Sequence, residues 1–315
     1  MPAQSATPAT AIRRILIPVD GSPASLEAIA YARRFSGATL LLLKVGIDLV
    51  DVLPDLVPAD IDAMHNELLA ELEAIAGPLR DDGVTVQTMV EDGDAAERIV
   101  AVANSEGVDL VIMTTHGRGA AGRVLFGSVA DRVSRHAEVP TLLVRIGLES
   151  GTHQPERVLV TLDGSPRAEA ALPIAQAIAS QIGLPITLAR VVTLDEALAR
   201  ASRIQGTLVG RPLDTTDEVL AIARREASQQ AQRYLDDLAA TIGPHTSALV
   251  LHGSPAVTLL QEIRSTDLVI VTSHGAHGVT RWLIGSVAEK LVREAIAPIV
   301  LVPARGQSSR STEDL

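Results

Sequence analysis

Residues 14–25 read "RILIPVDGSPAS", and residues 157–168 read "RVLVTLDGSPRA". In both stretches an apolar segment leads into Asp-Gly-Ser-Pro, a sequence typical of a turn that opens a helix. The motifs that follow also return in the same order: "DLVIMTTHG" (109–117) matches "DLVIVTSHG" (267–275), and "GSVADRVSRHAEVPTLLV" (127–144) matches "GSVAEKLVREAIAPIVLV" (285–302). The chain therefore contains two copies of one structural unit.

The repeat predicts the domain boundaries. We expect a first copy at residues 1–147, a linker at 148–156, a second copy at 157–305 and a disordered tail at 306–315. The second copy is the longer one, because it carries an insertion at 193–226 that is polar and contains glycine and proline. This insertion predicts a longer loop or lid.

Short apolar runs alternate with longer helix-period segments in each copy. In the first copy we expect strands at 14–19, 39–45, 84–90, 110–114 and 141–145, and helices at 24–35, 61–79, 95–104 and 128–136. Most of the runs are apolar throughout, which is typical of parallel strands covered on both faces. The predicted fold is α/β, with two tandem doubly wound, Rossmann-like domains, each a five-stranded parallel sheet flanked by four helices. Ligands of such domains bind outside the carboxyl ends of the strands.

Composition excludes several classes of protein. The chain is 47% hydrophobic and only 2% aromatic, and its net charge of −11 argues against a sequence-independent nucleic-acid binder. It has no cysteine, so disulfides, thiol catalysis and cysteine-bound metals are excluded. The first residues lack the apolar core of a secretory signal, and no apolar run is long enough to span a membrane. We therefore expect a cytoplasmic protein with no membrane or nucleic-acid partner.

Gly117, Gly119 and Gly122 spell G-x-G-x-x-G, the dinucleotide-binding fingerprint. That fingerprint belongs after the first strand of its unit, whereas this one follows the fourth. The second copy also replaces two of the glycines, by His277 and Thr280. We therefore interpret the fingerprint as accidental.

Both copies share a different pattern, Thr-(Thr/Ser)-His-Gly, nine residues, and then Gly-Ser at a helix start. The N–H groups and positive dipole end of a helix attract phosphate, and Ser and Arg side chains add donors. A helix cap with a tight turn is the alternative, but the recurrence of the pattern at one spacing favours phosphate. The histidines are expected to brace the loop or contact a phosphate. The shared residues are Thr114, His116, Gly117, Arg123, Gly127 and Ser128, matched by Thr272, His274, Gly275, Arg281, Gly285 and Ser286.

An aspartate follows the first strand of each copy, Asp20 and Asp163. Either residue could bind a ribose, a base edge or a metal ion, or it could cap the following helix, and the two interpretations remain open. A phosphorylated receiver aspartate is less favoured, because the acidic residues after the third strand are not repeated in the second copy and no lysine follows the fifth strand.

These residues resemble the ATP-binding members of the universal stress protein family, which carry G-x-x-G, nine residues and G-(S/T) after the fourth strand. Here Thr114 and Thr272 stand at the first glycine. The resemblance implies strand order 3-2-1-4-5, pairing of the two copies through their last strands, and a homodimer. It also implies one site per copy for ATP, with or without Mg²⁺. We expect no metal site, because the recurring histidines lack metal-ligand companions. The implied nucleotide-binding residues are Pro18, Asp20, Val45, Thr114, His116, Gly117, Arg118, Arg123, Gly127, Ser128, Val129, Asp163, Val191, Thr272, His274, Gly275, Arg281, Gly285, Ser286 and Val287.

The resemblance favours an ATP-binding regulator of stress adaptation. The alternative is a nucleotide-independent dimeric interaction module of the same family. The two threonines support this alternative, and the intact Gly-Ser helix starts oppose it. An adenylyl-transferring enzyme is a third hypothesis, but "DGSPAS" is not the Ser-Gly-Gly loop of such enzymes. We expect no catalytic residues, because the sequence offers no placed general base or arginine finger for fast phosphoryl transfer. Slow ATP hydrolysis is compatible with the sequence but is not the predicted role.

Overall fold

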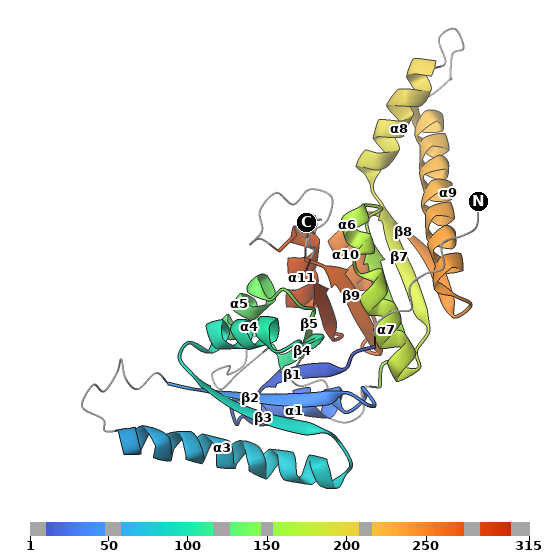
Figure 1. Cartoon of the computed structure of the whole chain (residues 1–315). Coiled ribbons are helices and arrows are strands. Elements are labelled where there is room, and N and C mark those ends of the chain that lie inside the picture. Colours follow the sequence, from blue (N-terminus) through green and yellow to red (C-terminus); the bar gives the residue numbers. More distant parts are fainter. Residues whose placement is uncertain are drawn as a thin grey trace, which may run out of the picture.

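The computed structural model describes residues 11–47, 58–115, 127–145, 154–207, 216–273 and 284–303 (Figure 1). The elements of the first copy are β1 (Arg14–Pro18), α1 (Pro23–Ala32), β2 (Thr39–Gly46), α3 (Pro58–Asp81), β3 (Val86–Asp92), α4 (Ala95–Ser105), β4 (Leu110–Thr114), α5 (Ser128–His136) and β5 (Thr141–Val144). Those of the second copy are β6 (Arg157–Leu162), α6 (Pro166–Glu169), α7 (Leu172–Ile182), β7 (Ile186–Val192), α8 (Leu194–Thr207), α9 (Thr216–Ile242), β8 (Thr246–His252), α10 (Pro255–Glu262), β9 (Asp267–Thr272), α11 (Ser286–Glu294) and β10 (Ile299–Val302). The expected α/β alternation is confirmed in both copies.

The strands of both copies form a single ten-stranded sheet in the order β3-β2-β1-β4-β5-β10-β9-β6-β7-β8. Each copy has the expected order 3-2-1-4-5, with parallel neighbours. The two copies meet where β5 pairs with β10, and this pair is antiparallel. The predicted pairing through the last strands is therefore confirmed. It covers two apolar edges that would otherwise invite aggregation.

The core lies on both faces of the sheet and runs through both copies. On one face the strands pack against α1, α3, α7 and α9, and on the other against α4, α5, α10 and α11. Leu142 of β5 and Val300 of β10 are fully buried partners at the joint. Strands covered on both faces need apolar side chains on both, which explains the continuous apolar runs of the sequence.

Side chains reinforce the joint between the copies. The Gln181 side chain on α7 accepts from the Ile12 amide (3.1 Å) and donates to the carbonyls of Ile12 and Ser36 (both 3.0 Å). Arg145, after β5, donates to backbone carbonyls of Val292 and Arg293 in the last turn of α11. A cation is favourable at this negative end of a helix.

The second copy departs from the expected four helices, since its described residues form six. The first helical segment is divided into α6 and α7, because Pro173 lacks the N–H that would continue the ladder and instead sits in the first turn of α7. The insertion predicted as a loop is largely helical: α8 spans its first part, and α9 begins at Thr216. The Thr193 hydroxyl accepts from the Glu196 amide at 3.2 Å and so caps α8. Figure 1 shows α8 lying beside α9.

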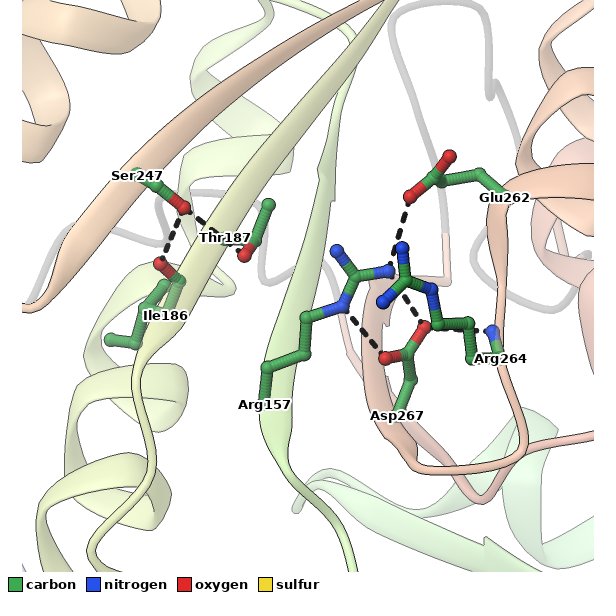
Figure 2. Close-up of polar contacts among 7 residues, drawn as sticks. All are labelled: Arg157, Ile186, Thr187, Ser247, Glu262, Arg264 and Asp267. Carbon is green, nitrogen blue, oxygen red and sulfur yellow. Dashed lines mark hydrogen bonds and ion pairs between the residues drawn. The ribbon is translucent and has the colours of Figure 1, made fainter.

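A polar network ties β6 to β9 at their amino ends, opposite the edge where ligands are expected (Figure 2). Asp267 is only 1% exposed, and its carboxylate accepts from Arg157 Nε at 2.7 Å and from an Arg157 terminal nitrogen at 3.1 Å. Arg157 also contacts Glu262 at 3.2 Å, and the Arg264 amide donates to Asp267 at 2.9 Å. The hydrogen-bond donors to the buried Asp267 carboxylate, Arg157 and the Arg264 amide, thus all belong to the second copy.

Asp94 caps α4, and its removal should destabilise the first copy. Its carboxylate accepts from the Glu97 amide at 3.0 Å and from Arg132 at 2.7 Å. We expect Asp94→Ala to lower the free energy of unfolding by about 1 kcal/mol in urea denaturation at neutral pH, and Asp94→Asn to restore most of it. Ser254 is the matched control, because it precedes α10 without a side-chain cap bond, so Ser254→Ala should have a smaller effect.

The Asp94 contribution should also depend on pH. The Glu97 amide, followed by Arg132, lowers the pKa of the Asp94 carboxyl in the folded protein. A lowered folded pKa means that the stabilisation is complete above the ordinary carboxyl value of about 3.9 and is lost as the pH falls through the folded value. The difference in unfolding free energy between wild type and Asp94→Ala should therefore shrink in acid. A difference that stays constant down to about pH 2 would contradict this.

Candidate functional site

A cavity of about 920 Å³ opens at the carboxyl ends of the first-copy strands. It is bounded by the ends of β1, β2 and β4, by the starts of α4 and α5, and by one side of α3. This is the edge at which doubly wound domains bind ligands. The predicted site residues that line it are Pro18, Asp20, Val45, Thr114, Gly127, Ser128 and Val129. The structure thus brings together residues spread across more than a hundred positions of sequence.

The structure distinguishes the two roles considered for the aspartates. Asp20 Oδ1 accepts from the Ser22 amide (2.9 Å) and hydroxyl (2.6 Å), while the Ser22 hydroxyl accepts from the Ser25 amide at 3.3 Å. The helix cap is therefore the serine, and the aspartate braces the turn before it. Asp163 and Ser165 repeat the arrangement in the second copy. Asp20 remains exposed at the cavity wall, where it can meet a ligand.

Helices α5 and α11 have a glycine at the N-cap position and no side-chain cap, whereas a side chain caps α1, α4 and α6. The Gly127 amide donates to the Thr115 carbonyl at 2.7 Å, and the Gly285 amide donates to the Ser273 carbonyl at 2.6 Å. These bonds hold each helix start against the end of β4 or β9. Because glycine brings no side chain, the amino end of α5 faces the cavity without a side-chain cap from its N-cap residue, an arrangement that suits an anion.

Part of the predicted phosphate loop lies outside the described residues. This applies to His116, Gly117, Arg118 and Arg123 in the first copy and to His274, Gly275 and Arg281 in the second. Their assigned roles stay predictions.

Sequence reasoning missed the charged pair Lys44 and Glu71. Lys44, near the end of β2, is 8% exposed, forms an ion pair with Glu71 of α3, and lines the cavity with it. A signal was present, since Lys44 interrupts the apolar run "LLLLKV", and a charge in a buried strand usually has a partner or a function.

Gly46, at the end of β2, is closely packed in the wall of the first-copy cavity. A β-carbon on Gly46 would lie 2.6 Å from Asp92 Oδ1 and 3.0 Å from a methyl carbon of Leu68, too close for any larger residue without rearrangement. Both Gly46 and Leu68 line the cavity, so this close packing shapes its wall.

The remaining predicted residues of the second copy lie at the equivalent edge of the sheet. Asp163 follows β6, Val191 lies near the end of β7, Thr272 ends β9, and Gly285 leads into α11 with Ser286 and Val287. Val191 and Thr272 are buried. The strand ends therefore meet as predicted, while the side chains around them differ from the first copy.

The described residues contain neither a cluster of metal ligands nor a helix that could span a membrane. Within them, no three His, Asp or Glu side chains cluster in a way that could hold a metal ion. None of their helices is both long enough and apolar enough to cross a membrane.

Comparisons with known proteins agree with the tandem architecture. The profile of the universal stress protein family matches residues 11–145 and again 155–303. A universal stress protein of Mycolicibacterium smegmatis is 30% identical over 226 residues, which is 71% of this chain and 70% of that protein. One of Mycobacterium bovis is 26% identical over 311 residues, covering 91% of this chain and 94% of that protein. The crystal structure of a universal stress protein from Archaeoglobus fulgidus superposes with a TM-score of 0.64 at 20% identity, over 93% of this chain and 98% of the other, and supports the fold.

Proposed function

The chain belongs to the universal stress protein family, and from that premise we propose that it binds ATP and acts as a regulator in stress adaptation. The observation that carries the proposal is the cavity of about 920 Å³ at the switch point of the first copy. It lies within the range of about 300–1,000 Å³ that small-molecule sites occupy. Seven of the nucleotide-binding residues that the family resemblance implies line it.

The lining of the cavity suits the parts of a nucleotide. Apolar side chains, among them Val45, Ile99 and Val129, offer a dry surface for a base. Asp20 offers a carboxylate acceptor for hydroxyl groups, and the amino end of α5 favours phosphate through its N–H groups and dipole. The polar and apolar features therefore occupy the same cavity.

We propose binding rather than turnover as the main role. Among the described residues that line the cavity, the acidic side chains are Asp20, Glu67 and Glu71, and Glu71 forms an ion pair with Lys44. Fast phosphoryl transfer requires a positioned base or water and an arginine at the transferring group. Nucleotide occupancy would then be the signal that a partner reads.

Two experiments test the proposal. In the first, the purified chain is denatured and the released small molecules are separated by chromatography. In the second, the nucleotide-free chain is titrated calorimetrically with ATP, with and without Mg²⁺. We expect ATP to be released or to bind with measurable heat. If neither occurs, the nucleotide-independent interaction module is correct instead. Association of two whole chains into a homodimer stays a prediction, which light scattering at several concentrations tests.

A further inference from the structure

The counterparts of Lys44 and Glu71 in the second copy are Arg190 and Tyr234. Strand register sets the first match: Leu43 pairs with Pro18, and Ala189 pairs with Thr161, so the following residues are equivalent. The second match follows from α3 and α9, which bury Leu72 and Leu235 completely on the same face of the sheet. Glu71 and Tyr234 directly precede these leucines.

Arg190 lies across the turn that follows β6. A β-carbon on Gly164 would be 3.0 Å from its Cζ and 3.1 Å from both terminal nitrogens, so the guanidinium rests against the Gly164 backbone. The same guanidinium pairs with Glu196 of α8 at 3.3 Å and stacks over the Tyr234 ring at 5.5 Å from the centroid. Its side chain is only 15% exposed.

Tyr234 completes the assembly on the other side. Its hydroxyl donates to Glu169 of α6 at 2.9 Å. Burial, and then the neighbouring Glu169, raise the pKa of the tyrosine, so it remains a hydrogen-bond donor across the physiological range. Arg190 and Tyr234 thus link α6, β7, α8 and α9, whereas in the first copy the corresponding α1, β2 and α3 border the cavity.

The end of the second strand also changes between the copies. Gly46 and Leu68 of the first copy are replaced by Val192 and Ala231, which are 3% and 1% exposed and pack together. The large and small members of the pair have been exchanged. In the second copy the Val192 side chain therefore takes the place at which the Leu68 side chain approaches Gly46 in the first copy.

We propose that Arg190 and Tyr234 close the second copy to nucleotide, so that the chain binds a single ATP, in its first copy. This inference rests on the proposed function. A nucleotide entering the second copy would have to displace the guanidinium from Gly164 and break its contacts with Glu196 and Tyr234. Such ion-pair and cation–π contacts gain strength where water is excluded.

Calorimetry and photolabelling of the intact chain test the inference. We expect one ATP per chain, and we expect 8-azido-ATP to crosslink only to peptides of residues 11–145 after proteolysis and mass spectrometry. Two ATP per chain, or label in residues 155–303, would overturn the inference and leave the proposed function intact. An absence of binding would overturn both.

A second variant tests whether this pair causes the closure. Arg190→Lys with Tyr234→Glu installs the charged pair of the first copy, and we expect it to raise the count from one ATP to two, with new label in the second copy. The matched control, Lys44→Arg with Glu71→Tyr, should reduce the count from one to none. If both variants keep the wild-type circular dichroism spectrum and still bind one ATP, the pair does not control access and the inference fails.

Discussion

Arg157→Leu should lower the free energy of unfolding by about 3–5 kcal/mol, because removing one partner of a buried ion pair leaves the other charge uncompensated. Asp267 is 1% exposed, and both of its carboxylate oxygens accept from Arg157. In the variant the Arg264 amide remains as a partner, but it carries no positive charge. Guanidinium denaturation followed by circular dichroism measures the loss.

Arg14→Leu is the matched control, since Arg14 begins β1 as Arg157 begins β6. In the first copy, Asp109 accepts from the backbone amides of Arg13 and Arg14, at 2.7 and 2.9 Å, rather than from a guanidinium. The Arg14 side chain instead pairs with the partly exposed Glu106 at 3.3 Å. Such pairs contribute up to about 1 kcal/mol, so equal losses in the two variants would contradict the role assigned to Arg157.

Gly127→Asp should weaken ATP binding by at least about 100-fold, which corresponds to about 2.7 kcal/mol. Two like charges about 4 Å apart repel by about 4 kcal/mol near a protein surface, and the carboxylate would face the phosphates at the start of α5. The fold should tolerate the change, because Gly127 has φ −63° and ψ 143°, which any residue adopts, and Asp is a favoured N-cap residue. Calorimetric titration with ATP gives the affinity.

Gly285→Asp makes the same change at α11, where φ is −61° and ψ is 149°. If the second copy is closed, ATP affinity and stoichiometry should match those of the wild type. If Gly285→Asp loses ATP binding and Gly127→Asp retains it, the nucleotide binds in the second copy and the inference is wrong. Loss in both variants at moderate ionic strength would indicate that each helix start contributes.

The sheet could be predicted from the sequence because its information is local. Strands buried on both faces require unbroken apolar runs, and the repeat supplied each run twice. Helix starts were also predictable: α4 and α5 begin at Ala95 and Ser128, the first residues of the expected helices 95–104 and 128–136. The cavity followed from topology, since the carboxyl ends of parallel strands share one edge.

The features that the sequence left undetermined depend on side chains distant along the chain. In the sequence, Arg190 is a charged residue in a strand and Tyr234 an aromatic residue in a helix. Only the fold shows that the two side chains are in contact. Lys44 likewise needs Glu71 from another element. Polar residues, glycines and a proline predict a loop in the insertion, whereas packing of α8 on α9 buries Ala201, Val219 and Ala223.

The antiparallel β5–β10 contact has an evolutionary consequence. In an assembly of two identical chains, every substitution appears in both subunits, so one site cannot be lost while the other is kept. In this chain the two domains are joined covalently. Leu142 of β5 therefore pairs with Val300 of β10 and not with a second Leu142. Each domain can therefore acquire substitutions that the other does not share. One domain can specialise in ligand binding, while the other loses that selection and is retained because it packs against the first.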